Sequence, residues 1–266
     1  MAFSSTHAVF EIPEIREMIL LKVDMRTLLC MQRTCRSWLR TIKESLAIQK
    51  ALFFTPIENT PDQEKAQNLL LAEAFPPLFQ VINPLIPEDA FGYVYDNTFT
   101  TFDMLKDPSI GAAYLRPEAS WRRMLVQQPP VRDFAVIMNT TGGYGYNHEY
   151  FKVPEDPRGF TDGLRMGDFF EALMFDDDLD YAIFRLKRVT WWKRTSQHGL
   201  SVLNQMGQLM GKTVDSDIVL TLRAHPGGSH DSEDQKIRDA IRAAYQVLGI
   251  QPRLFGKADQ WSHFPW

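Results

Sequence analysis

The sequence has little of what exported and membrane-spanning proteins need. It contains two cysteines, Cys30 and Cys35. They lie five residues apart on different faces of a predicted helix, so neither a disulfide nor a redox pair is implied. No apolar run approaches the roughly 20 residues of a membrane helix, and the first residues show no basic segment followed by an apolar block. We therefore expect a reduced compartment, cytoplasm and/or nucleus, and no membrane partner.

Signatures of metal and nucleotide sites are equally scarce. The run at 207–213 is one residue shorter than a phosphate-binding loop and follows a predicted helix instead of a strand. The glycines at 142–145 do not match the dinucleotide-binding spacing. His225 and His230 offer two ligands on a glycine-rich loop, whereas a catalytic zinc site holds three rigidly. The acids at 176–180 lack the glycine and final glutamate of a calcium loop. We expect no metal, no cofactor and no catalytic residue.

The formal charge of −4 is unevenly distributed along the chain. Residues 1–56 hold eight Lys/Arg and five Asp/Glu, a net charge of +3, so the remainder carries −7. This basic bias is too mild to predict a nucleic-acid partner. Arg33, Arg36, Arg40 and Lys43 recur at steps of three and four, which predicts a basic stripe on a helix. The stripe is either a solvated face or a contact for an acidic partner surface.

Residues 1–56 have the pattern of closely spaced short helices. Pro13 predicts the start of the first, because proline at the first helical position loses no hydrogen bond. Asp24 and Ser45 are predicted caps of later helices. The apolar residues of this segment outnumber the positions that one small interior offers. We therefore expect some of them at the surface, available to a partner.

The string IPEIREMILLKVDMRTLLCMQRTCRSWLRTIKESLAIQKALFF resembles the F-box of filamentous-fungal proteins. Two departures are Ile12, where leucine is frequent, and a Val23-Asp24-Met25 connector without proline. The segments RPEASWRRMLVQQPPV at 116–131 and DGLRMGDFF at 162–170 resemble the region downstream of the F-box in the same uncharacterised family. The residues that match the F-box are Ile12, Pro13, Glu14, Ile19, Leu20, Asp24, Leu28, Leu29, Gln32, Arg33, Cys35, Arg36, Trp38, Ile42, Ser45, Leu46, Ala51, Leu52, Phe53 and Phe54.

The resemblance implies that residues 1–56 bind a Skp-type adaptor protein and, through it, a cullin. The alternative is that the leucines of this segment only face the C-terminal half of the chain. The expected contacts with the adaptor are Ile12, Pro13, Ile15, Ile19, Leu20, Leu28, Leu29 and Gln32. The expected core of the F-box is Cys35, Trp38 and Ile42.

The rest of the chain divides into a connecting segment at 57–108 and a C-terminal domain at 109–266. The connecting segment is rich in proline and aromatic residues, which indicates packing instead of a free linker. Expected helices cover 61–74, 117–127, 197–210 and 233–248, and a turn at 162–163 is expected to lead into a further helix that ends at 175. Expected strands cover 131–139, 181–192, 217–223 and 250–255. The predicted fold is α+β, with a three-helix F-box before an α+β domain whose small sheet is mostly antiparallel.

The predicted function is that of a substrate-receptor subunit of a Skp–cullin–F-box ubiquitin ligase, with no catalysis of its own. The C-terminal domain would bind an unknown target protein. Trp261, Phe264 and Trp266 are candidate target contacts, although such side chains more often pack on their own domain. The alternatives are an F-box protein that acts outside ubiquitin ligases and an enzyme with an unrecognised C-terminal site.

Overall fold

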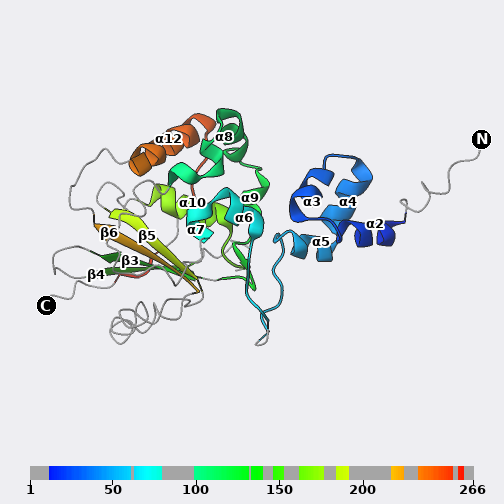
Figure 1. The fold of residues 1–266 in the computed structure, drawn as a ribbon, viewed down its shortest axis with the longest axis horizontal. Helices are drawn as coiled ribbons and strands as arrows, with labels where there is room; N and C mark the ends of the chain where they lie inside the picture. Colours follow the sequence, from blue (N-terminus) through cyan, green and yellow to red (C-terminus); the bar gives the residue numbers. More distant parts are fainter. Residues whose placement is uncertain are drawn as a thin grey trace, which may run out of the picture.

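The computed structural model describes residues 12–60, 63–79, 99–131, 133–139, 146–152, 162–176, 184–191, 217–224, 233–253 and 257–260. Short helices and two small sheets make up these residues, which confirms the predicted α+β class. Figure 1 shows the first four helices, in blue, grouped to one side of a larger body that contains the five-stranded sheet. No helix in the described ranges is long and apolar enough to span a membrane.

The N-terminal helices are α2 (Pro13–Leu20), α3 (Met25–Met31), α4 (Arg36–Glu44) and α5 (Leu46–Ala51). Two predicted caps are confirmed: Asp24 accepts a hydrogen bond from the Thr27 amide at 2.9 Å, and Ser45 accepts one from Ile48 at 3.1 Å. Helix α4 packs against both α2 and α5. The fully or almost fully buried apolar side chains of this group are Leu20, Leu28, Ile42, Ile48 and Leu52.

The predicted helix at 61–74 is wrong in its first half. Residues 63–65 form no regular structure, strand β1 (Ala66–Gln67) follows, and helix α6 (Leu69–Ala74) comes after it. The helix begins late because the Asn68 side chain caps it, accepting hydrogen bonds from the amides of residues 70 and 71. Further along lie α7 (Pro76–Phe79), the 3-10 helices η1 (Phe99–Thr101) and η2 (Asp103–Leu105), and α8 (Pro108–Tyr114).

The predicted helix at 117–127 is also shorter than expected. Helix α9 (Ser120–Arg123) ends early, and strand β2 (Gln127–Gln128) pairs antiparallel with β1. In the segment between α9 and β2, the Leu125 amide donates to Phe53 O at 2.8 Å, and the Val126 amide donates to Leu164 O at 3.1 Å. Hydrogen bonds to distant parts of the chain therefore replace those that a longer helix would make.

The larger sheet has the strand order β5-β6-β3-β4-β7. Its strands are β3 (Asp133–Asn139), β4 (Tyr146–Lys152), β5 (Phe184–Trp191), β6 (Ile218–Ala224) and β7 (Lys257–Gln260). The β3–β6 pair is parallel, and the other pairs are antiparallel. The strand predicted at 250–255 is absent over residues 250–253, and β7 forms a few residues later. The glycine-rich segment 140–147, where a turn is expected, ends inside β4, which begins at Tyr146. Its residues 140–145 and the expected helix at 197–210 lie outside the described residues.

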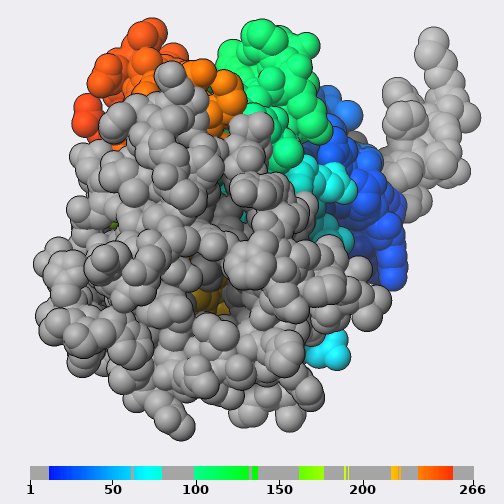
Figure 2. Space-filling model, turned by 60° about the vertical axis from the view of Figure 1, so that its left-hand side comes forward, coloured from blue at the N-terminus to red at the C-terminus, as the bar shows by residue number. Residues whose placement is uncertain are grey.

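Helix α10 (Met166–Phe175) packs against the sheet, with the rings of Phe169 and Phe134 at 5.2 Å. Helix α12 (Glu233–Leu248) packs against α10, and Figure 1 shows both helices on one side of the sheet. Gly249 ends α12 with a φ of +66°, which favours glycine. Figure 2 shows α12, in orange, beside α8, in green, with the N-terminal helices in blue at the side.

Candidate functional site

The N-terminal helices expose apolar side chains to solvent. Ile12 is 46% exposed, Met18 63% and Leu21 41%, all on α2 or at its ends. Leu46 is 57% exposed and follows Ser45, whose hydroxyl donates to the Glu17 carboxylate on α2. We call Ile12, Met18, Leu21 and Leu46 the exposed apolar group. They are four of the nine large apolar side chains that are exposed among the described residues, and a partner that covered them would remove their apolar area from water.

The predicted adaptor contacts fall into three classes of burial. Ile12 and Pro13 are exposed, and Leu20 and Leu28 are 0% and 2% exposed. These two leucines therefore belong to the interior of the helices, and a partner cannot touch them while the helices stay folded. The remaining contacts stay predictions, and their side chains are half-buried: Ile15, Ile19, Leu29 and Gln32.

Sequence reasoning missed Met18, Leu21 and Leu46 as surface residues. Apolar residues on every side of a short helix do not reveal which side faces inward. The available signal was Glu14. Met18 follows it by four residues and Leu21 by three more, so the three side chains lie along one side of α2. A charged residue at the start of such a stripe indicates the solvent side.

The predicted core residues have different environments. Ile42 is fully buried, and Trp38 is partly buried against the core. Cys35 is exposed, which corrects its assignment to the core. The reason is its place at the N-cap of α4, where its backbone is extended and precedes the turns of the helix that pack. Cys30 is also exposed, and both thiols are free.

The predicted basic stripe lies on the surface. Arg33, Arg36, Arg40 and Lys43 are all exposed, and the last three occupy α4. No side chain of the four forms a hydrogen bond or an ion pair with another residue in the described part of the chain. These cations are therefore available to a partner as well as to solvent.

A set of contacts joins the end of α5 to the larger body. The Gln128 side chain donates to the carbonyl oxygens of Lys50 and Thr55, each at 3.0 Å. Arg165, the N-cap residue of α10, donates to Phe54 O at 3.3 Å, and the Arg123 guanidinium lies 4.7 Å from the centre of the Phe54 ring. We call these contacts the junction. They bring the segment at 123–128 and the start of α10 against the end of the N-terminal helices.

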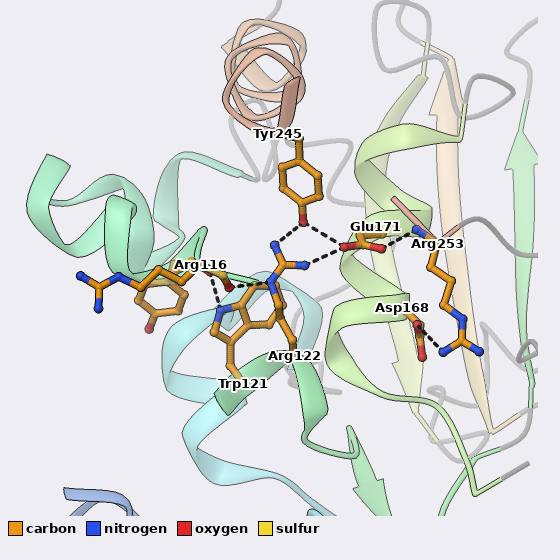
Figure 3. Close-up of polar contacts among 8 residues, drawn as sticks. Arg116, Trp121, Arg122, Asp168, Glu171, Tyr245 and Arg253 are labelled. Carbon is orange, nitrogen blue, oxygen red and sulfur yellow. Dashed lines mark hydrogen bonds and ion pairs between the residues drawn. The ribbon is translucent and has the colours of Figure 1, made fainter. Parts of the chain in front are cut away.

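A second group of polar residues is buried inside the larger body (Figure 3). Arg122 pairs with Glu171 at 2.6 Å, and their side chains are 10% and 7% exposed. Arg122 also donates to the Tyr245 hydroxyl at 2.6 Å, and this hydroxyl donates to Glu171 at 3.2 Å. The second carboxylate oxygen of Glu171 accepts from the Arg253 amide at 2.6 Å. We call Arg122, Glu171 and Tyr245 the buried triad.

Burial raises the pKa of the Tyr245 hydroxyl, and the nearby charge of Glu171 raises it further. Burial also raises the pKa of Asp168, against the opposing effect of Arg253, whose guanidinium lies 3.9 Å away. Each member of the triad has a partner among the others, so the arrangement ties α9, α10 and α12 together. Sequence reasoning missed the triad. The available signal was Glu171, an acid within the apolar run of α10.

The other candidate sites gain no support. Among the residues that the structure describes, no cluster of His, Cys, Asp and Glu has the arrangement of a metal site. Asp176 is half-buried at the C-cap of α10. The remaining candidates lie outside the described residues: 142–145, 207–213, Asp177, Asp178, Asp180, His225, His230, Trp261, Phe264 and Trp266.

No family model, no curated protein and no solved structure matches this chain. The molecule is therefore defined by its own features: an α+β protein with exposed apolar and basic side chains on its first helices. Those helices are the candidate functional site.

Proposed function

We propose that this chain is a substrate-receptor subunit of a Skp–cullin–F-box ubiquitin ligase. The N-terminal helices bind the Skp-type adaptor, and the larger body binds a target protein. The observation that carries the proposal is the exposed apolar group, which lies within the segment that resembles an F-box. In this arrangement ubiquitin transfer belongs to other subunits, and the chain acts by binding in the cytoplasm and/or nucleus.

The energy for adaptor binding comes from covering the exposed apolar group. Complete burial of one large apolar side chain stabilises a complex by about 1.5–3 kcal/mol. Met18 and Leu21 are already partly covered in the free chain, at 63% and 41% exposure. Covering what remains of both contributes about 2 kcal/mol, or roughly 30-fold in Kd.

The junction supports the proposal because it ties the two halves by several hydrogen bonds to main-chain oxygens. A receptor has to hold its adaptor-binding and target-binding surfaces in one molecule. The burial of Leu20 and Leu28 removes two of the expected contacts from the proposed interface. They give the helices an interior of their own, so adaptor binding needs only the residues that remain on the surface.

The first test measures adaptor binding by a variant of the exposed apolar group. Met18→Gln with Leu21→Gln removes two apolar side chains near the end of a helix and leaves the net charge unchanged. We expect Kd for a purified Skp-type adaptor to rise roughly 30-fold, as worked out above. Circular dichroism should remain that of the parent chain, because neither side chain is in the core.

The matched control is Val247→Gln with Leu248→Gln, which changes two exposed apolar residues in the last turn of α12. This variant should bind the adaptor with the parent Kd. Equal binding by both variants would show that the exposed apolar group is not the adaptor-binding surface. A parent chain that does not bind the adaptor would remove the proposal altogether.

Co-purification followed by mass spectrometry separates the proposal from its alternatives. Recovery of adaptor, cullin and a target supports a ligase receptor. Recovery of adaptor without cullin indicates an F-box protein that acts outside ubiquitin ligases. A bound metal or nucleotide without an adaptor would favour an enzyme.

A further inference from the structure

Helix α4 presents three cations on one side. Arg36, Arg40 and Lys43 are separated by four and three residues, which places them within one narrow arc of the helix. All three are exposed, and at about 1.5 Å per residue they extend over roughly 10 Å. We call these three residues the α4 stripe. Arg33 lies just before the helix and adds a fourth exposed cation nearby.

The acids of the N-terminal helices do not neutralise the α4 stripe. Asp24 is engaged by Thr27, whose amide and hydroxyl both donate to it. Glu17 accepts a hydrogen bond from Ser45. Glu14 and Glu44 are exposed, and Glu44 lies four residues after Arg40 on the helix. Among the described residues, however, neither acid forms an ion pair with the stripe.

The α4 stripe is unfavourable in the free chain. Like charges at steps of three or four on a helix repel each other, and none of the three cations has an ion pair among the described residues. The stripe also contributes nothing to the core, because α4 packs through Thr41 and Ile42 on its other side. A partner with negative charge would turn this repulsion into attraction.

The uneven charge of the chain indicates the chemistry of that partner. Residues 1–56 carry +3 and the rest carry −7, so the chain has a strong charge asymmetry. An acidic protein is repelled by the larger body and attracted to the N-terminal helices, which orients it before contact. Helix α4 packs directly against α2, so one partner can cover α2 and meet the stripe at the edge of the same interface.

We propose that the α4 stripe binds an acidic segment of the adaptor protein and accelerates its association with this chain. The inference rests on the proposed function and specifies the charge of the partner. The exposed apolar group holds the bound complex together, whereas the stripe governs how fast the complex forms. Polar residues at the rim of an interface typically act in this way, on the association rate and its salt dependence.

The test measures association and dissociation rates for the full chain and a purified Skp-type adaptor, at low and high salt. In the variant Arg36→Gln/Arg40→Gln/Lys43→Gln, we expect an association rate about tenfold lower at low salt. The dissociation rate should change by less than about threefold. The parent association rate should fall as salt rises, and that of the variant should be nearly independent of salt.

The matched control is Lys106→Gln/Arg116→Gln/Lys236→Gln, which removes three exposed cations outside the N-terminal helices. Its association rate should stay close to that of the parent. If both triple variants slow association equally, only net charge matters and the inference is wrong. If the stripe variant behaves as the parent while Met18→Gln/Leu21→Gln loses binding, the inference fails and the proposed function stands.

A chemical readout identifies the acidic contact directly. A carbodiimide joins a lysine amine to a carboxylate in contact with it, so the complex should yield a cross-link from Lys43 to an Asp or Glu of the adaptor. Lys43→Arg should abolish this cross-link and keep the parent association rate, because the charge remains. Binding of a short DNA duplex that the triple stripe variant loses would overturn the inference in favour of nucleic acid.

Discussion

Glu171→Gln is the substitution for which the structure gives the clearest energetic expectation. The change keeps the size of the side chain and removes its charge. Arg122 then loses its counter-ion in a place where both side chains are at most 10% exposed. The amide group of glutamine also turns one acceptor into a donor, so either Arg122 or the Arg253 amide faces a donor where it had an acceptor.

The magnitude follows from what remains around Arg122. Removing one partner of a buried ion pair costs about 3–5 kcal/mol. Arg122 retains the Tyr245 hydroxyl at 2.6 Å and the Arg116 carbonyl at 3.2 Å. The Trp121 ring also lies 4.9 Å from its guanidinium. We therefore expect Glu171→Gln to lower the free energy of unfolding by about 3 kcal/mol, the lower end of that range.

Urea unfolding followed by circular dichroism and tryptophan fluorescence measures this loss. The matched control is Glu233→Gln, which breaks an exposed pair with Lys236 whose side chains are 55% and 56% exposed. Its cost should be below about 0.5 kcal/mol. If Glu171→Gln costs no more than this control, the buried triad does not hold the helices together and the reasoning is refuted.

Two further predictions concern burial. Asp168→Asn should raise stability at neutral pH, because burial raises the pKa of this carboxyl and its charged form is disfavoured in the fold. Because the folded-state pKa of Asp168 is raised, the parent chain loses stability as the pH rises above the ordinary value of 3.8. The variant cannot ionise at this position, so its gain in urea midpoint over the parent chain should disappear below that pH. A gain that persists in acid would contradict the role of charge. Leu28→Ala should cost about 2–5 kcal/mol, whereas Leu46→Ala, at a site 57% exposed, should cost under about 0.5 kcal/mol. Thermal unfolding of both variants checks this, and equal costs would show that the assigned interior is wrong.

Local signals in the sequence were sufficient for several elements. The caps at Asp24 and Ser45 act within three residues, so their helices could be predicted without knowledge of the fold. The helix at 233–248 has a regular apolar stripe and a terminal glycine, and its bounds are as expected. The strand at 133–139 lies in the middle of the sheet, and its residues 134–138 form a continuous apolar run.

The failures share a physical cause, which is dependence on distant residues. The helix predicted at 117–127 ends early because residues 125 and 126 donate to Phe53 and Leu164. No pattern in the neighbouring sequence predicts those two hydrogen-bond partners. The buried triad depends on the same kind of contact, since Arg122 and Tyr245 are 123 positions apart. To predict that Leu28 is buried and Met18 is exposed, one also has to know how α2, α3 and α4 pack.

The junction has a mechanical consequence. Arg165 donates to Phe54 O, three residues beyond α5, and is the N-cap residue of α10, the helix that carries Glu171 and lies against the sheet. Because α10 also packs against α12 and against the sheet, only one helix separates the junction from both of them. Residues 57–60 make none of the junction contacts, so residues inserted there would leave these contacts intact. Residues inserted between Ala51 and Thr55 would separate Lys50 from Thr55, and Gln128 could then no longer donate to both.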